Sequence, residues 1–179
     1  MIKTEFFLAG FGGQGILFAG KFLAYKGLSE GWQLSWLPSY GPEMRGGTAN
    51  CSVIISDQPI ASPIIVVPDV LIAMNLPSFD KYEDEVKSGG MIFYDSTLID
   101  RVGKRDDIKY FPIPATRLAF DNNMKTMANM ILMGKVLKVF KDYHEDQIEA
   151  TLKKIIPESK ADKFEINRKA IEIGANYEG

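Results

Sequence analysis

Five residues near the amino terminus form the pattern in this sequence that is best suited to chemistry. Gly10, Gly12, Gly13, Gln14 and Gly15 make a G-x-G-x-x-G turn between two apolar stretches. Glycines let the backbone turn tightly and approach a ligand, and the first N–H groups of a helix that follows lie unpaired at the positive end of its dipole. The turn therefore predicts a phosphate site. The alternative is a tight strand-to-helix turn that binds nothing.

A nicotinamide or flavin dinucleotide is disfavoured as the ligand of this turn. Such sites place a carboxylate about 20 residues after the glycines, at the end of the second strand, to bind the ribose. The second predicted strand, 33–37, runs into a proline-containing loop with no acid at its end, and Glu43 lies beyond two prolines. The glycine turn therefore lacks the second half of a dinucleotide motif.

A second polar cluster follows in residues 36–50. Its two prolines and three glycines exclude a helix or a central strand, so an ordered loop is predicted. Ser39, Tyr40 and Arg45 offer hydrogen-bonding groups there, and in a doubly wound sheet this loop lies beside the glycine turn. The alternative is a structural loop with a surface pair between Glu43 and Arg45.

Other reactive side chains are few. Cys51 is the only cysteine and His144 the only histidine, whereas a [4Fe–4S] cluster needs four thiolates and a zinc site needs several N or S ligands, so no metal site is expected. Cys51 is predicted to be buried and inert in a strand, and His144 to be a surface residue. Asp95 and Asn75 each follow a predicted strand, where a polar side chain either caps the next turn or helix or faces the ligand crevice. For Asp95 the capping role is favoured.

Composition fits one domain spanning residues 1–179. The chain is 46% hydrophobic and can bury one sizeable core. A net charge of −2 without a basic block argues against nucleic acid. No signal peptide is expected, because residues 1–5 run into a predicted strand without a basic region, and no apolar run reaches the roughly 18 residues that a membrane span needs. Together with the lone cysteine, these features predict a cytoplasmic protein that has no membrane partner.

Short apolar runs alternate with longer amphipathic stretches. This pattern predicts an α/β fold with three layers: a Rossmann-like mixed sheet, mostly parallel, with helices on both faces. A turn at 56–60 predicts that strand 49–56 pairs with the next segment as a hairpin. Methionines within 125–141 are expected to face the core. Strands are predicted at 4–9, 33–37, 49–56, 64–67, 70–74, 91–94 and 109–113, and helices at 14–27, 77–86, 125–141, 144–155 and 159–175.

Seven stretches of this sequence, from the glycine turn at 10–15 to residues 167–170, together resemble the gamma subunit of the 2-oxoacid:ferredoxin oxidoreductases. The resemblance covers nearly the whole chain and implies the fold of domain III of pyruvate:ferredoxin oxidoreductase. Residues 43–53, Glu-Met-Arg-Gly-Gly-Thr-Ala-Asn-Cys-Ser-Val, are similar to the 2-oxoglutarate type, whereas pyruvate-type subunits tend to read Pro-Glu-Arg-Arg-Gly-Ala-Pro here. The stretches that carry it are 10–15, 38–47, 68–75, 89–90, 112–116, 128–130 and 167–170.

The resemblance implies a division of labour. Such enzymes decarboxylate a 2-oxoacid on thiamine diphosphate and magnesium, send electrons through [4Fe–4S] clusters to ferredoxin, and pass the acyl group to coenzyme A. The thiamine and the clusters belong to partner alpha, beta and delta subunits, so the isolated chain is expected to be inactive, without a catalytic residue, and a candidate homodimer.

The resemblance also implies that this chain helps to seat coenzyme A. The glycine turn, Ser39, Tyr40 and Arg45 are the expected contacts, and Lys21 resembles a lysine of the fused pyruvate enzymes that is placed to reach a phosphate. Two other functions stay open. One is a purely structural clamp, and the other is a stand-alone nucleotide-binding protein.

Overall fold

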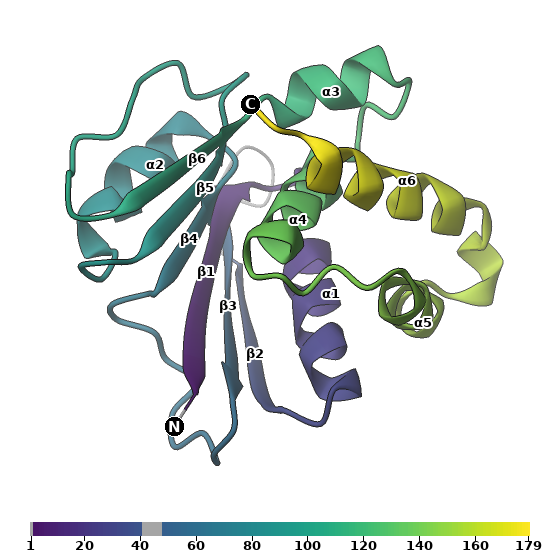
Figure 1. The fold of residues 1–179 in the computed structure, drawn as a ribbon, viewed down its shortest axis with the longest axis horizontal. Coiled ribbons are helices and arrows are strands. Elements are labelled where there is room, and N and C mark those ends of the chain that lie inside the picture. Colours follow the sequence, from purple (N-terminus) through teal and green to yellow (C-terminus); the bar gives the residue numbers. More distant parts are fainter. Residues whose placement is uncertain (1, 41–47) are drawn as a thin grey trace.

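Six strands form a single mixed sheet in the computed structural model, which describes residues 2–40 and 48–179. The strand order is β2-β3-β1-β4-β5-β6, and β1, β4, β5 and β6 run parallel (Figure 1). β3 is antiparallel to both of its neighbours, which confirms the predicted mixed and mostly parallel sheet. The strands are β1 (Lys3–Phe11), β2 (Gln33–Tyr40), β3 (Thr48–Ser56), β4 (Val70–Ala73), β5 (Met91–Asp95) and β6 (Lys109–Ile113).

Helices cover both faces of the sheet, as predicted. α2 lies on one face, and α1 and α4 lie on the other with α5 and α6 outside them (Figure 1). Two short 3-10 turns, Glu83–Glu85 and Glu158–Lys160, follow α2 and precede α6. The helices are α1 (Ile16–Ser29), α2 (Leu76–Tyr82), α3 (Ala115–Asp121), α4 (Ala128–Val139), α5 (Glu145–Ile155) and α6 (Asp162–Asn176). None of these helices has the length and hydropathy needed to cross a membrane.

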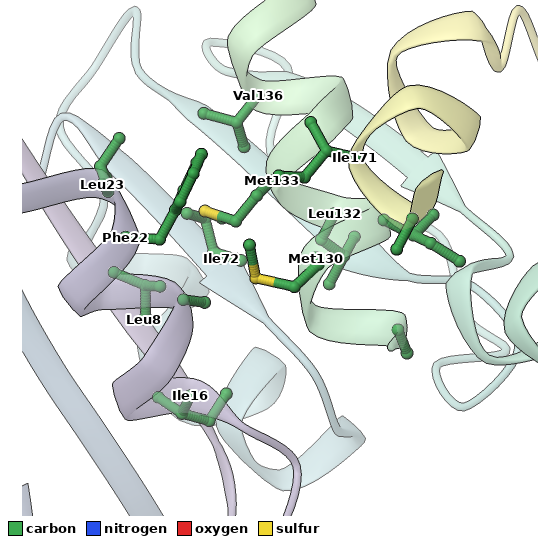
Figure 2. Packing of buried hydrophobic residues seen from close by; sticks show 14 of the residues in the cluster. Leu8, Ile16, Phe22, Leu23, Ile72, Met130, Leu132, Met133, Val136 and Ile171 are labelled. Carbon is green, nitrogen blue, oxygen red and sulfur yellow. The ribbon is translucent and has the colours of Figure 1, made fainter. Parts of the chain in front are cut away.

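The main core lies between the sheet and the pair α1 and α4. Leu8 and Ile72 of the sheet meet Phe22 of α1 and Met130 and Met133 of α4, and all five side chains are buried (Figure 2). Each such side chain contributes roughly 1.5–3 kcal/mol through burial. The prediction that the methionines of this helix face the core is confirmed.

Glycines set two close contacts behind this core. A Cβ on Gly134 of α4 would overlap the carbonyl oxygen of Ile171, and a Cβ on Gly174 of α6 would overlap that of Ile131. α4 and α6 therefore pack backbone to backbone. Gly20 of α1 plays the same part against β3, because a Cβ there would overlap the Sγ atom of Cys51.

Two predictions about the middle of the chain are wrong. Residues 64–67 form no strand, although the run Ile64–Val67 is continuously apolar, and strand β3 forms no hairpin with the segment that follows it. β3 is instead enclosed by β1 and β2, which leaves no free edge for another partner. The segment 57–69 therefore crosses from β3 to β4 as a connection without regular secondary structure.

The two outermost strands each contain a proline. β2 continues through Pro38 to Tyr40, past the predicted strand end, because an edge strand tolerates a missing donor. In β6, Lys109 N donates to Gly90 O and Ile113 O accepts from Ser96 N, so these residues face β5. Strand residues alternate in direction, and the missing N–H of Pro112 therefore falls on the outer edge.

Candidate functional site

The glycine turn joins β1 to α1 and has the geometry that its sequence predicts. Gly13 and Gly15 adopt left-handed backbone angles, with φ of 94° and 75°. Gly15 is the N-cap of α1 and makes no side-chain cap, since it has no side chain to offer. Gly12 and Gly13 are exposed, and the space where a Cβ of Gly13 would lie is open. At Gly12 and Gly13 the turn thus presents backbone to solvent.

Gln14 braces this turn against the end of β4. Its Nε2 donates to Met74 O at 2.9 Å, and its Oε1 accepts from Phe11 N at 2.6 Å. A longer contact of 3.5 Å runs from Asn75 Nδ2 to the same oxygen. All of these partners belong to the chain itself. The structure therefore gives Gln14, one of the predicted contact residues, the geometry of a brace.

Asn129 lies directly behind the turn and is the residue that sequence reasoning missed. Its Nδ2 donates to Gly15 O at 3.0 Å, and its side chain fills the space where a Cβ of Gly15 would be. The residue is 4% exposed, and its Oδ1 has no hydrogen-bond partner among the described residues. Buried polar atoms are usually paired, so this acceptor needs an explanation. The available signal was an asparagine in the first turn of an otherwise apolar helix.

Two helices begin together at this turn. Asn129 contacts Gly15 where α4 and α1 start, and Lys26 pairs with Asp142 at 2.6 Å where the two helices end. α1 and α4 therefore run side by side in the same direction. In the described part of the chain, the N–H groups of Ile16, Leu17 and Phe18 make no hydrogen bond. Two positive helix ends and free donors favour an anion at this edge of the sheet.

The end of β2 reaches the same edge of the sheet. Tyr40 pairs with Ala49, which in turn pairs with Gly10, so Tyr40 lies two strands from the glycine turn. Adjacent strands are about 4.8 Å apart, which puts the two backbones about 10 Å from each other. Ser39 is exposed one residue earlier. Arg45 lies in 41–47, outside the described residues, as do seven of the fifteen residues of the predicted loop. The other eight, 36–40 and 48–50, belong to β2 and β3, so the prediction of a loop is wrong for them.

Lys21 is not brought to the turn. Its Nζ lies 5.5 Å from the ring centroid of Tyr25, one helical turn further along α1. At 1.5 Å per residue, Tyr25 is about 14 Å from the start of the helix. The structure therefore separates this lysine from the glycines with which the resemblance grouped it.

Cys51 and His144 are where the sequence predicted them. Cys51 is fully buried in β3, where its Sγ donates to Ile16 O at 3.7 Å, and burial raises its pKa to about 12. A thiol with so high a pKa is almost never a thiolate, so it is a poor nucleophile. His144 is exposed just before α5. Within residues 2–40 and 48–179, no three His, Cys, Asp or Glu side chains are grouped to hold a metal.

Asp95 and Asn75 are capping residues. Asp95 is fully buried, and its carboxylate accepts from Thr97 N at 3.1 Å and from Thr116 N at 3.1 Å, which fixes the start of α3. The cap favoured for Asp95 is therefore confirmed. Asn75 Oδ1 accepts from Ser78 N at 2.8 Å and caps α2. Both polar groups at these strand ends are engaged within the chain.

A strand, a glycine turn and two converging helix starts define a Rossmann-like α/β protein. Residues 5–177 match the family described as "Pyruvate ferredoxin/flavodoxin oxidoreductase", and the chain belongs to this family. The resemblance to its gamma subunits is confirmed by the crystal structure of a keto/oxoacid ferredoxin oxidoreductase gamma subunit from Geobacter sulfurreducens. The two chains are 28% identical with a TM-score of 0.82, and the match covers 97% of this chain and 95% of that one.

Two groups of curated relatives differ in length. The ketoisovalerate oxidoreductase subunit VorA of Methanothermobacter marburgensis is 37% identical over 176 residues, which cover 95% of this chain but 35% of that protein. The chain thus spans about a third of the length of this relative. The 2-oxoglutarate synthase subunit KorC of Methanocaldococcus jannaschii is 32% identical over 165 residues, which cover 90% of this chain and 88% of the relative.

A longer solved chain shows the same fold. It is a chain of the 2-oxoglutarate:ferredoxin oxidoreductase from Magnetococcus marinus with 2-oxoglutarate, coenzyme A and succinyl-CoA bound. Its TM-score is 0.86 at 22% identity, and the match covers 98% of this chain and 31% of that one. The fold therefore occurs both as a separate chain and as part of a longer one.

Proposed function

We propose that this chain is the gamma subunit of a 2-oxoacid:ferredoxin oxidoreductase, an enzyme that oxidatively decarboxylates a 2-oxoacid, reduces ferredoxin and forms an acyl-CoA. The near full-length match to a separate gamma subunit carries this proposal. Thiamine diphosphate, magnesium and [4Fe–4S] clusters are assigned to alpha, beta and delta partner subunits, as the family resemblance implies, and for the clusters the single cysteine of this chain agrees, because a cluster needs four thiolates. Purifying the native complex and identifying its chains tests the assignment; a gamma chain that copurifies with no thiamine-binding partner would contradict it.

We propose further that the glycine turn helps to seat coenzyme A. The free N–H groups at the start of α1 match the ligand's diphosphate in charge and in hydrogen-bonding type. The starts of α1 and α4 meet at this turn, and two positive helix ends support an anionic ligand over a purely structural clamp.

The proposed seat consists of backbone with a few side chains at its rim. Gly12 and Gly13 are exposed on the turn, and Ser39 and Tyr40 end β2 at the same edge of the sheet. Arg45 completes the proposed contacts through its charge. Lys21 stands outside the seat, since its ammonium lies over Tyr25.

A pair of isosteric variants tests the seat. Gly13→Asp and Gly13→Asn place side chains of similar size in open space. Both variants also lose about 1–2 kcal/mol of folding free energy, because the residue keeps a left-handed backbone. They differ in charge. In the assembled enzyme, Gly13→Asp should raise KM for coenzyme A at least tenfold above that of Gly13→Asn, with KM for the 2-oxoacid unchanged. Equal KM values for coenzyme A would favour the structural clamp.

For the 2-oxoacid, 2-oxoglutarate is the proposed substrate. The resemblance of residues 43–53 and the near full-length match to KorC support it. Ketoisovalerate is the second candidate, favoured by the higher identity to VorA. The ratio of kcat/KM for the two acids, measured on the purified complex with ferredoxin reduction as the readout, decides between them. Substrate contacts in partner subunits would set this ratio.

A further inference from the structure

One peptide unit connects Asn129 to a donor of the proposed seat. The carbonyl oxygen of Gly15 and the N–H group of Ile16 belong to the same trans, planar peptide, so the two groups point in opposite directions. Gly15 O faces into α1, where it accepts from Ala19 N at 3.0 Å. The N–H of Ile16 is therefore directed out of the helix start, and it makes no hydrogen bond within the described residues. A contact that fixes Gly15 O also fixes this donor.

Asn129 fixes that carbonyl oxygen from outside the helix. Its Nδ2 donates to Gly15 O at 3.0 Å, so the oxygen accepts two hydrogen bonds, one for each lone pair. The Oδ1 of Asn129 has no partner among the described residues, and Nδ2 is therefore the atom through which this side chain acts on the turn. The amide is buried, so water does not compete with it for the carbonyl oxygen.

The hydrogen bond from Asn129 also strengthens the donor. Hydrogen bonds in a chain polarise one another, so a donor placed on a carbonyl oxygen makes the N–H group of the same peptide a better donor. Gln14 holds the turn as well, through Phe11 N and Met74 O. The Ile16 N–H is thus aimed and polarised before a ligand arrives. A donor fixed in this way binds an anion more tightly than a mobile one, because less motion has to be frozen at binding.

We propose that Asn129 is a positioning residue for the coenzyme A seat: it holds the peptide between Gly15 and Ile16 so that the Ile16 N–H meets the diphosphate. Asn129 acts through the turn and does not touch the ligand, because its amide is buried against Gly15. A residue of α4 thereby sets the strength of a contact made at the start of α1. The inference rests on the proposed function and deepens it.

Kinetics of the assembled enzyme provide the test. Asn129→Leu removes the donor and keeps the approximate size of the side chain. It should raise KM for coenzyme A about fivefold, the effect of one ordinary hydrogen bond, with kcat and KM for the 2-oxoacid within about twofold of wild type. Asn129→Ala adds no bulk beside Gly15 and should have the same effect, so it replaces the leucine variant if that one does not fold. Circular dichroism and thermal unfolding check the fold of each variant.

Asn167→Leu is the matched control. Asn167 is also 4% exposed in a helix, its Nδ2 donates to a backbone carbonyl within α6 at 2.7 Å, and its Oδ1 has no partner among the described residues. Gly174 of α6 lies against Ile131 of α4, and Ile171 lies against Gly134, so the two helices are antiparallel. Asn167 is therefore remote from the start of α4. Its substitution should change KM for coenzyme A by less than about twofold, although it loses the same kind of hydrogen bond.

A double variant separates this inference from the proposed function. Gly13→Asp repels the diphosphate from the same N–H groups, so adding Asn129→Leu to it should raise KM for coenzyme A by less than about twofold further, whereas independent effects would multiply. Full multiplication, or an equal rise in KM for Asn167→Leu, would overturn the positioning role. So would a normal KM in both Asn129 variants while Gly13→Asp still raises it, and the seat would then stand without Asn129. Equal KM values for Gly13→Asp and Gly13→Asn would overturn the seat and this inference together.

Discussion

The amide of Asn129 lies against the α-carbon of Gly15, and its Nδ2 donates to Gly15 O at 3.0 Å. This single contact joins the start of α4 to the N-cap of α1. It also explains why position 15 requires glycine, since both the left-handed φ of 75° and the asparagine side chain exclude a Cβ.

Gly15→Ala should therefore destabilise the chain by about 2–4 kcal/mol, from left-handed strain plus overlap with Asn129. Urea unfolding measures this change. Gly13→Ala is the control, because it shares a positive φ but has open space around its Cβ, and it should cost only about 1 kcal/mol. Equal losses for the two variants would show that Asn129 moves aside freely.

Gly20→Ala should destabilise the chain by about 1–3 kcal/mol, because the new methyl group would overlap the Sγ atom of Cys51. In a Cys51→Ala background the sulfur is gone, and the cost of Gly20→Ala should fall by about 1 kcal/mol or more. A double-mutant cycle of unfolding free energies measures this coupling. Simple additivity would mean that α1 shifts away from β3 without cost.

Tyr110→Phe should destabilise the chain by about 1–2 kcal/mol at pH 8. The Tyr110 hydroxyl donates to Glu83 Oε1 at 2.6 Å and accepts from Arg105 N at 3.1 Å, and removing it leaves the buried Glu83 carboxylate with one donor fewer. Chemical unfolding of Tyr110→Phe, Phe111→Tyr and the wild type under the same conditions measures the change in unfolding free energy.

The same tyrosine predicts a pH dependence. Burial, and then the hydrogen bond to Glu83, raise its pKa from the ordinary 10 to about 12. The folded chain therefore keeps the proton longer than the unfolded chain does, so this stabilisation is complete below pH 10 and declines between pH 10 and 12. Tyr110→Phe should lose less stability than wild type across that interval. If the unfolding free energies of the two proteins fell equally between pH 10 and 12, this would contradict the assignment of the pH dependence to Tyr110.

Cys51 should resist alkylation in the folded chain. Its pKa of about 12 leaves a thiolate fraction of about one in ten thousand at pH 8, and the side chain is fully buried. Iodoacetamide labelling followed by mass spectrometry should therefore show almost no adduct natively and complete modification in denaturant. Rapid labelling of the folded chain would show that the contact between Cys51 of β3 and Ile16 of α1 opens readily.

The sequence predicts local features of this fold well. The turn from β1 into α1 follows from glycines within six residues, and β4 and β5 follow from short, continuous apolar runs. Each of these elements is determined by residues within its own stretch of sequence. The position of the candidate site at the end of β1 was predictable for the same reason.

Features that depend on distant residues were not predictable. α3 has no capping side chain nearby; its cap is Asp95, 21 residues from Thr116. Asn129 reaches Gly15 over 114 residues, so its position emerges only from packing. The run Ile64–Val67 has strand composition but lies on the surface, because β3 already has both neighbours.

The prolines in β2 and β6 limit how this protein can join larger structures. Pro38 and Pro112 each remove a backbone donor from an outermost strand, so a seventh strand could not form a complete ladder on either side. The sheet is thus finished at six strands, and neither amyloid-like stacking nor a sheet shared with another subunit is a favourable route. Quaternary structure must instead be built from side-chain surfaces and connecting segments.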